Sequence, residues 1–394
     1  MDPITNPFAP GAGTAPPELA GRDSIRETVR IVLERTRRGL AVKSVILIGL
    51  RGVGKTVLLS RMRLDAEANG FATLMAEAPE SRSLPALLAP QLRQALLELS
   101  WNAHAKHIAE RALRALAGFV RAMRVRYHDI EVGIDFEPEP GLADNGDLEH
   151  DLQALLLAAG DAASAAGTAL VLFVDELQYV ATDQLAALIV ALHGASQRSA
   201  PVVLVGAGLP QLRGRMGDAK SYAERLFEFP EIGPLDEAAA TLAIVKPIEQ
   251  QNAAIHAAAV GDIFARTQGY PYFLQEWGKH TWDAAPASPI TRDDVQKASA
   301  LAVAALDESF FRVRFDRLTP TEKRYLRAMA DLGHGPARSG DIAARLDKSV
   351  TAVAPTRGKL IEKGMIWSPS HGDTAFTVPL FDEFMRRIIP GDDW

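Results

Sequence analysis

The sequence has no cysteine among its 394 residues. Disulfide bonds, thiolate metal sites and a cysteine nucleophile are therefore excluded. Its nine histidines show no H-E-x-x-H or similar ligand spacing, so we expect no structural metal. The longest apolar runs, such as residues 169–174, are far shorter than the roughly 20 residues that a membrane-spanning helix needs. Residues 1–17 lack a basic segment followed by an apolar one, so we expect no signal peptide, no membrane partner and a cytoplasmic location.

A large excess of one charge sign is also lacking. The net charge is −6, with 47% hydrophobic and 23% charged residues, a composition typical of folded globular proteins. This balance argues against a protein coated in basic surface, whereas a local basic patch remains compatible with it. Because 394 residues exceed one ordinary core, we expect two or three domains.

Short apolar runs alternate with helical segments over the first 234 residues. The predicted strands are residues 45–48, 71–75, 170–174 and 202–205, and the predicted helices include 25–38, 57–69, 148–166 and 184–193. Strands that are apolar on both faces and alternate with helices are typical of a parallel sheet covered by helices. The sequence therefore predicts an α/β fold, a three-layer sandwich.

Four parts follow one another along the chain. Residues 1–20 are rich in proline and predict an arm on the surface, and residues 21–234 form the α/β domain. An insertion at about 79–147 contains a helical stretch, 84–126, and a β-like piece, 130–136. Residues 235–316 are helical. Residues 317–394 predict three helices and a hairpin, the order of a winged helix-turn-helix.

Residues 49–56 read GLRGVGKT and fit the phosphate-loop pattern G-x-x-x-x-G-K-[ST] between a predicted strand and a predicted helix. Glycines let the backbone wrap around a phosphate with its N–H groups pointing inward, and the next helix adds its positive N-terminal end. Lys55 is expected to bridge the β- and γ-phosphates, and the Thr56 hydroxyl to bind Mg²⁺. The predicted nucleotide-binding residues are Gly49, Arg51, Gly52, Val53, Gly54, Lys55, Thr56 and Val57.

An acidic pair follows the apolar strand 170–174. We expect Asp175 to hold Mg²⁺ and Glu176 to act as general base toward the attacking water. The plainer alternative is an acidic helix start after a core strand. Together with the phosphate loop, the pair favours hydrolysis of a nucleotide such as ATP to ADP.

These motifs, with Gly21-Arg22-Asp23 before the first helix and Gly269-Tyr270-Pro271 in the helical part, resemble the AAA+ ATPases of the origin-recognition-complex-like and STAND branch. The resemblance extends over essentially the whole chain and implies that residues 235–316 form a lid over the nucleotide. It implies that Arg22 lies near the adenine and that Pro271 belongs to the G-x-P motif of the lid.

The resemblance also implies a polar sensor after strand 202–205, where this chain has only Gly206-Ala207-Gly208. Gln178 is a candidate substitute. Arg225 stands where such ATPases place an arginine finger, with an ion pair to Glu224 or Glu228 as the alternative. Tyr270 and Tyr272 are expected in the core.

Six basic residues and one acidic residue lie between positions 106 and 126, namely Lys106, Arg111, Arg114, Arg121, Arg124 and Arg126 with Glu110. Such a run is typical of a phosphate-tracking surface, of a solvated helix face or of a protein-docking surface. In the predicted recognition helix 349–363, the candidate contacts to double-stranded DNA are Thr351, Thr356, Arg357 and Lys359. We predict an ATP-hydrolysing switch, with a possible homo-oligomer, that acts on DNA. The alternative is an ATP-dependent assembly scaffold whose winged helix binds protein.

Overall fold

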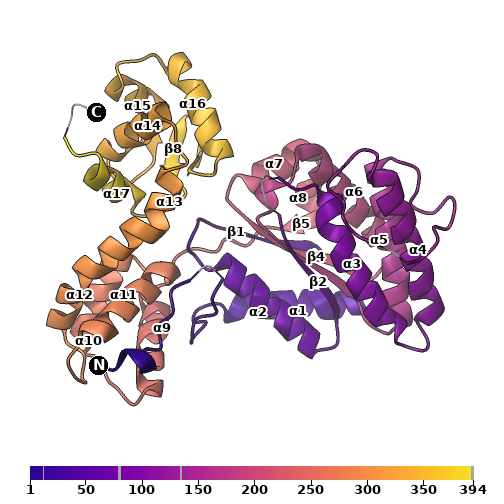
Figure 1. Cartoon of the computed structure of the whole chain (residues 1–394), viewed down its shortest axis with the longest axis horizontal. Helices are drawn as coiled ribbons and strands as arrows, with labels where there is room; N and C mark the ends of the chain where they lie inside the picture. The colour runs from indigo at the N-terminus through magenta and orange to yellow at the C-terminus, as the bar shows by residue number, and fades with distance from the viewer. Residues whose placement is uncertain (12, 79–80, 134, 392–394) are drawn as a thin grey trace. The chain divides into compact units, whose positions relative to one another are not determined.

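The chain folds into two compact units, as seen in the computed structural model, which describes residues 1–11, 13–78, 81–133 and 135–391 (Figure 1). The α/β unit contains Arg22–Ile48 and Lys55–Glu231. The helical unit contains Met1–Gly21, Gly49–Gly54 and the described residues from Ile232 onward. Within the described residues, no helix is both long enough and apolar enough to cross a membrane.

The α/β unit is built on one parallel sheet. Its strands lie in the order β2-β3-β4-β1-β5, and every pairing is parallel. The bounds are β1 Ser44–Ile48, β2 Ala72–Glu77, β3 Leu170–Asp175, β4 Val202–Gly208 and β5 Phe227–Glu228. Strands β1, β3 and β4 are buried along their whole length, which explains their unbroken apolar sequences. The predicted α/β fold is confirmed, while β5 was missed because two residues carry no strand pattern.

Helices cover both faces of this sheet. Helices α1 (Asp23–Arg37) and α2 (Lys55–Ala68) lie on one side, and α3 to α6 lie on the other (Figure 1). The latter are α3 Leu84–Ser100, α4 Lys106–Met123, α5 Leu148–Ala165 and α6 Thr182–Gln197. The short helices η2 (Leu177–Tyr179), α7 (Leu212–Ala219) and α8 (Ala223–Leu226) follow strands β3 and β4.

The insertion differs from its predicted secondary structure in two respects. The helical stretch 84–126 is two helices, α3 and α4, separated by a turn, and α4 packs against both α3 and α5. The β-like piece 130–136 forms no strand at the positions that the structure describes. Its alternating pattern arises because Ile130 and Val132 are buried, and their carbonyls accept hydrogen bonds from the Arg124 guanidinium instead of a neighbouring strand.

The helical unit begins with α9 (Glu237–Gln250), α10 (Ala257–Thr267), α11 (Pro271–Ala284) and α12 (Arg292–Ala305). A π-helical turn, η3 (Leu306–Phe311), and α13 (Arg312–Phe315) continue directly from α12. The C-terminal elements are α14 Pro320–Asp331, β6 Ala337–Arg338, α15 Ser339–Arg345, α16 Val350–Glu362, β7 Ile366–Trp367, β8 Asp373–Phe376 and α17 Phe381–Ile388. We predicted three helices and a hairpin in this order, whereas β6, which pairs with β8, and α17 were not foreseen.

The N-terminal arm is anchored to the helical unit. Phe8 is 3% exposed, and its ring lies where a side chain at Gly278 would have to go. The Trp282 indole donates to the Asp2 carbonyl over 2.8 Å, and the arm includes the short helix η1 (Pro3–Thr5). The proline-rich composition of residues 1–20 predicted an arm on the surface, and composition does not reveal that a single side chain, Phe8, is buried in the helical unit.

Candidate nucleotide-binding site

The predicted phosphate loop connects strand β1 to helix α2, and its glycines meet local backbone demands. Gly52 and Gly54 have φ of +81° and +88°, a region that L side chains rarely adopt. A Cβ on Gly49 would lie 2.2 Å from the Ile232 carbonyl oxygen. Helix α2 begins at Lys55, so its positive N-terminal end follows the loop directly. The loop has the backbone that an anion site requires.

The residues after the loop contact the end of strand β3. The Thr56 hydroxyl donates to Oδ2 of Asp175 over 2.6 Å, although the two residues are 119 positions apart in sequence. Lys55 and Asp175 are buried, at 7% and 1% exposure. The structure therefore brings together the two predicted Mg²⁺ ligands, a hydroxyl and a carboxylate, which are the oxygen donors that Mg²⁺ prefers.

Three carboxyl groups gather at the carboxyl end of the sheet. Burial raises the pKa of Asp175, although the hydrogen bond from Thr56 opposes the shift. Glu77, at the end of β2, pairs in register with Asp175, and its pKa is raised by burial and by the charges of Asp175 and Glu176. Concentrated negative charge of this kind favours a bound cation. Glu77 was missed because the predicted strand ended at Met75, two residues before it.

Gln178 links the predicted general base to the end of strand β4. The Glu176 backbone is left-handed, with φ of 54°, and its N–H donates to Oδ1 of Asp175 over 2.8 Å. The Gln178 side-chain amide donates to the Glu176 carboxylate, and its oxygen accepts the Leu209 N–H over 3.0 Å. The Gln178 side chain thus holds Glu176 from one end and the backbone after Gly208 from the other.

The missing polar sensor has a steric explanation. A Cβ on Gly206 would lie 2.4 Å from Cδ1 of Leu177, and one on Gly208 would lie 2.5 Å from Leu212 and 3.0 Å from Oε1 of Gln178. No side chain fits at either position without displacing a neighbour. Leu177 thus occupies the space beside Gly206, and Leu212 with Gln178 occupies the space beside Gly208.

Arg215 holds the segment that carries Gln178. Its guanidinium donates to the backbone carbonyls of Gln178 and, over 2.9 Å, of Val180. Arg215 lies in α7, a helix that the sequence did not predict, so nothing in the pattern indicated this contact.

Three other predicted site residues belong to three different helices. Arg22 precedes helix α1 as its N-cap residue. Arg225 is exposed in α8, and no ion pair joins it to Glu224 or Glu228 in the part of the chain that the structure describes. Pro271 is the first residue of α11.

Within the helical unit, two backbone hydrogen bonds hold the phosphate loop at consecutive residues. The Arg51 N–H donates to the Thr377 carbonyl over 3.1 Å, and the Tyr272 N–H donates to the Gly52 carbonyl over 3.3 Å. Thr377 follows β8, and its hydroxyl donates to the Met365 carbonyl over 3.1 Å. Sequence reasoning missed both contacts because backbone groups of distant segments leave no pattern.

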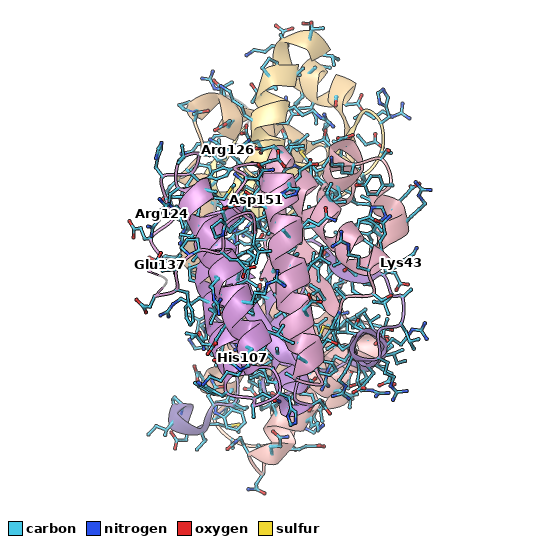
Figure 2. All side chains as sticks on the ribbon, turned by 90° about the vertical axis from the view of Figure 1, so that its right-hand side faces the viewer. Lys43, His107, Arg124, Arg126, Glu137 and Asp151 are labelled. Carbon is cyan, nitrogen blue, oxygen red and sulfur yellow. The ribbon has the colours of Figure 1, made fainter. Side chains whose placement is uncertain are left out.

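The basic run on α4 is partly neutralised. Arg111 pairs with Glu139 over 3.2 Å, and Arg126 pairs with Asp183 over 3.1 Å. Arg124 and Arg126 lie just past the end of α4 and His107 near its start (Figure 2). Over the described positions, the other four basic residues make no ion pair; Arg124 is bound to backbone carbonyls, whereas no hydrogen bond engages the charges of Lys106, Arg114 and Arg121.

The predicted DNA contacts on α16 differ in their surroundings. The Arg357 guanidinium donates to the Thr374 hydroxyl, the Ser368 hydroxyl and the Asp373 carbonyl, over 2.8–3.0 Å, so it is held by the hairpin. Thr351 and Lys359 are exposed, and Thr356 is half-buried.

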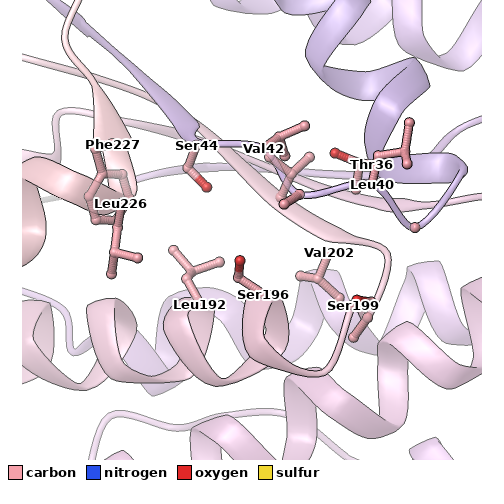
Figure 3. Close-up of a pocket in the computed structure, with 14 residues that line it drawn as sticks. Thr36, Leu40, Val42, Ser44, Leu192, Ser196, Ser199, Val202, Leu226 and Phe227 are labelled. Atoms are coloured by element: carbon pink, nitrogen blue, oxygen red, sulfur yellow. The ribbon is translucent and has the colours of Figure 1, made fainter.

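A small cavity lies at the opposite end of the sheet, where the strands begin. Its volume is about 40 Å³, and Ser44, Val202, Leu192, Ser196 and Phe227 are among its lining residues (Figure 3). This space holds about one water molecule or two, far below what a nucleotide needs. It is separate from the residues at the carboxyl end of the sheet.

Residues 18–205 match the family described as AAA ATPase domain, and residues 308–385 match a family described as a domain of unknown function. No curated protein matches the chain. A Walker-type ATPase of Pyrococcus abyssi has a similar structure, with a TM-score of 0.58 at 14% identity over 95% of this chain and 97% of that one, which shows a shared fold.

Two further solved structures have lower scores. The Aeropyrum pernix ORC1 protein in complex with DNA gives a TM-score of 0.49 at 15% identity, covering 94% of each chain. The Thermotoga maritima RuvB Holliday junction branch migration motor gives 0.45 at 16% identity, covering 92% of this chain and 94% of that one.

Proposed function

Since residues 18–205 match the family described as AAA ATPase domain, we propose that the chain is a nucleotide-driven switch of the AAA+/STAND type, in the origin-recognition-complex-like branch. ATP binding and hydrolysis control the arrangement of a lid, residues 235–316, and a winged-helix module, residues 317–394. The observation that carries this proposal is a pair of backbone hydrogen bonds at the phosphate loop: the Tyr272 N–H of the lid donates to the Gly52 carbonyl, and the Arg51 N–H donates to the Thr377 carbonyl of the module. A change in the loop on binding phosphate is therefore transmitted to both parts.

Each residue of the site has a proposed part in hydrolysis. The loop and Lys55 bind the phosphates, and Thr56 and Asp175 hold Mg²⁺, which when bound neutralises charge that develops on the phosphoryl group. Glu176 accepts a proton from the attacking water, and Gln178 fixes the direction of the Glu176 carboxylate.

Three further residues complete the proposed site. Arg22 lies near the base of the nucleotide, and Pro271 orients the first turn of the lid helix toward it. Arg225 acts on the γ-phosphate held by a neighbouring copy in a homo-oligomer, a role supported by its exposed side chain without an ion pair in the described structure.

The switch acts on DNA through helix α4 in this proposal. Arg114 and Arg121 are seven residues apart, two helical turns, so they lie on one face about 10.5 Å from each other along the axis. Side chains so spaced can neutralise phosphates of a duplex.

Fluorescence anisotropy with a labelled DNA duplex tests this reading across a salt series. We expect saturable binding at about 50 mM salt, and the double variant Arg114→Ala with Arg121→Ala should lower the slope of log affinity against log salt by about 2. Arg111→Ala is the matched control, because Arg111 is already paired with Glu139 and should contribute less. Absence of saturable binding at about 50 mM salt would refute the proposal that the chain acts on DNA.

A second function, docking of a protein partner, is favoured by the surface of α16. Its exposed residues are mostly uncharged, including Val350, Ala354, Pro355 and Gly358, whereas Arg357 is held within the module. A recognition helix for DNA needs several cations, and this surface offers mainly Lys359. DNA binding that is unchanged by Lys359→Ala but has a lower salt slope in the α4 double variant would assign DNA to α4 and leave α16 for protein.

A further inference from the structure

The first turn of helix α11 lies directly against the phosphate loop. Besides the hydrogen bond from the Tyr272 N–H to the Gly52 carbonyl, side chains of two residues cover Gly52. A Cβ at Gly52 would lie 3.6 Å from Cβ of Tyr272 and 3.8 Å from Cζ of Phe310, which are ordinary packing distances. Gly52 is therefore enclosed by one backbone contact and two aromatic residues, all within the helical unit.

The two aromatic rings form one stack. The centroids of Tyr272 and Phe310 are 4.6 Å apart, and their planes are inclined by 25°. The Phe310 and Phe273 rings meet edge to face, with centroids 5.7 Å apart. Both residues belong to the buried core of the helical unit, and Tyr272 packs against it. A stacked pair rooted in a packed core moves little, because interiors are as dense as organic crystals.

The Tyr272 hydroxyl lies in a partly buried environment beside an acidic group. Burial raises the pKa of Tyr272 and the neighbouring Glu276 carboxyl raises it further, whereas the nearby Ser309 hydroxyl opposes the shift. Glu276 is one turn further along α11, and Ser309 lies on the π-helical turn η3 beside Phe310. Helix α11 and η3 are joined by the aromatic stack at the point where they meet the loop.

We infer that Tyr272 and Phe310 form an aromatic clamp that fixes the phosphate loop at Gly52 in its nucleotide-binding conformation, with Tyr272 as a positioning residue. The inference rests on the proposed function, since it assigns a lid contact to the same site. Glycine loses more backbone freedom on ordering than any other residue, so a loop with a glycine at its centre binds phosphate weakly unless something restrains it. The clamp supplies this restraint before the nucleotide arrives, which strengthens nucleotide binding without touching the reacting atoms.

The full-length chain with Tyr272→Ala tests the clamp. Nucleotide affinity is measured from the fluorescence of a labelled ADP, and kcat and KM from steady-state ATP hydrolysis. We expect a dissociation constant raised about tenfold, equivalent to about 1.4 kcal/mol, with kcat within about twofold of the wild type. Phe310→Leu should act in the same direction. Tyr272→Phe keeps the ring and the N–H, so it should bind nearly as the wild type does.

Phe384→Leu is the control for general loss of stability. Phe384 is 1% exposed in the same aromatic core, where its ring contacts Phe311, Phe315 and Phe381. Thermal unfolding should show comparable destabilisation for Phe310→Leu and Phe384→Leu, while only the former weakens nucleotide binding. An unchanged dissociation constant in Tyr272→Ala, or an equal weakening in Phe384→Leu, overturns the clamp. A wild-type chain that binds no nucleotide overturns the proposed function instead, so the two failures are distinguishable.

Discussion

Replacing Gln178 by alanine removes two hydrogen bonds with separate consequences. The Leu209 N–H is buried and donates to Oε1 of Gln178 over 3.0 Å, so the substitution leaves it without its acceptor. An orphaned buried donor costs about 1–3 kcal/mol of folding free energy. The lost amide contact to Glu176 involves a charged acceptor, and such hydrogen bonds contribute about 1.5–3 kcal/mol.

Loss of the hydrogen bond from the Gln178 amide to the Glu176 carboxylate lowers the rate of hydrolysis if Glu176 is the base and Gln178 orients its carboxylate. At 1.36 kcal/mol per factor of ten, 1.5–3 kcal/mol corresponds to a decrease in kcat of about 10- to 150-fold. Because the loop and Lys55 are the proposed phosphate-binding groups, the affinity for ATP should change little. Steady-state hydrolysis gives kcat and KM, and urea unfolding gives the stability change for the same preparation.

Gln178→Glu separates the two bonds. A glutamate keeps an oxygen for the Leu209 N–H but places a second carboxylate against Glu176, so stability should fall less than in Gln178→Ala while kcat falls at least as far. The reasoning is refuted if Gln178→Ala loses 1–3 kcal/mol of stability yet hydrolyses ATP at the wild-type rate.

Three other changes test separate parts of the structure. Glu176→Gln should bind ATP with wild-type affinity but lose turnover, and unchanged hydrolysis would remove Glu176 from the role of base. Burial raises the pKa of Glu276 in the folded chain. The stability that the protonated Glu276 carboxyl contributes is therefore fully present below the pKa of the unfolded chain, and it is lost as the pH rises through the higher pKa of the folded chain. Glu276→Gln should therefore raise the urea midpoint at pH 7.5, and this gain should shrink toward pH 4. Arg225→Ala subunits mixed with Lys55→Ala subunits should recover part of the hydrolysis if Arg225 acts across a subunit boundary, and mixtures as inactive as either variant alone would contradict that arrangement.

Local sequence patterns predicted the parts of the protein that are formed by consecutive residues, namely the phosphate loop and the buried strands. Residues 49–56 form the phosphate loop because glycines at 52 and 54 are needed for positive φ, a requirement that the motif itself carries. The strands ending at Ile48 and Asp175 were predictable because burial on both faces demands unbroken apolar residues. The proximity of Thr56 to Asp175 followed from the motif pair, and the structure places their oxygens 2.6 Å apart.

Tertiary structure alone decided which groups complete the site. Glu77 reaches Asp175 because β2 pairs with β3, a neighbourhood that strand sequences do not encode. Leu177, Leu212 and Gln178 can pack against β4 because Gly206 and Gly208 carry no side chains there. The contacts of Tyr272 and Thr377 with the loop use backbone groups, which every residue possesses, so their positions depend on packing between segments more than 200 residues apart in the chain. The sequence by itself predicted the phosphate loop, and the fold determined which distant groups contact it.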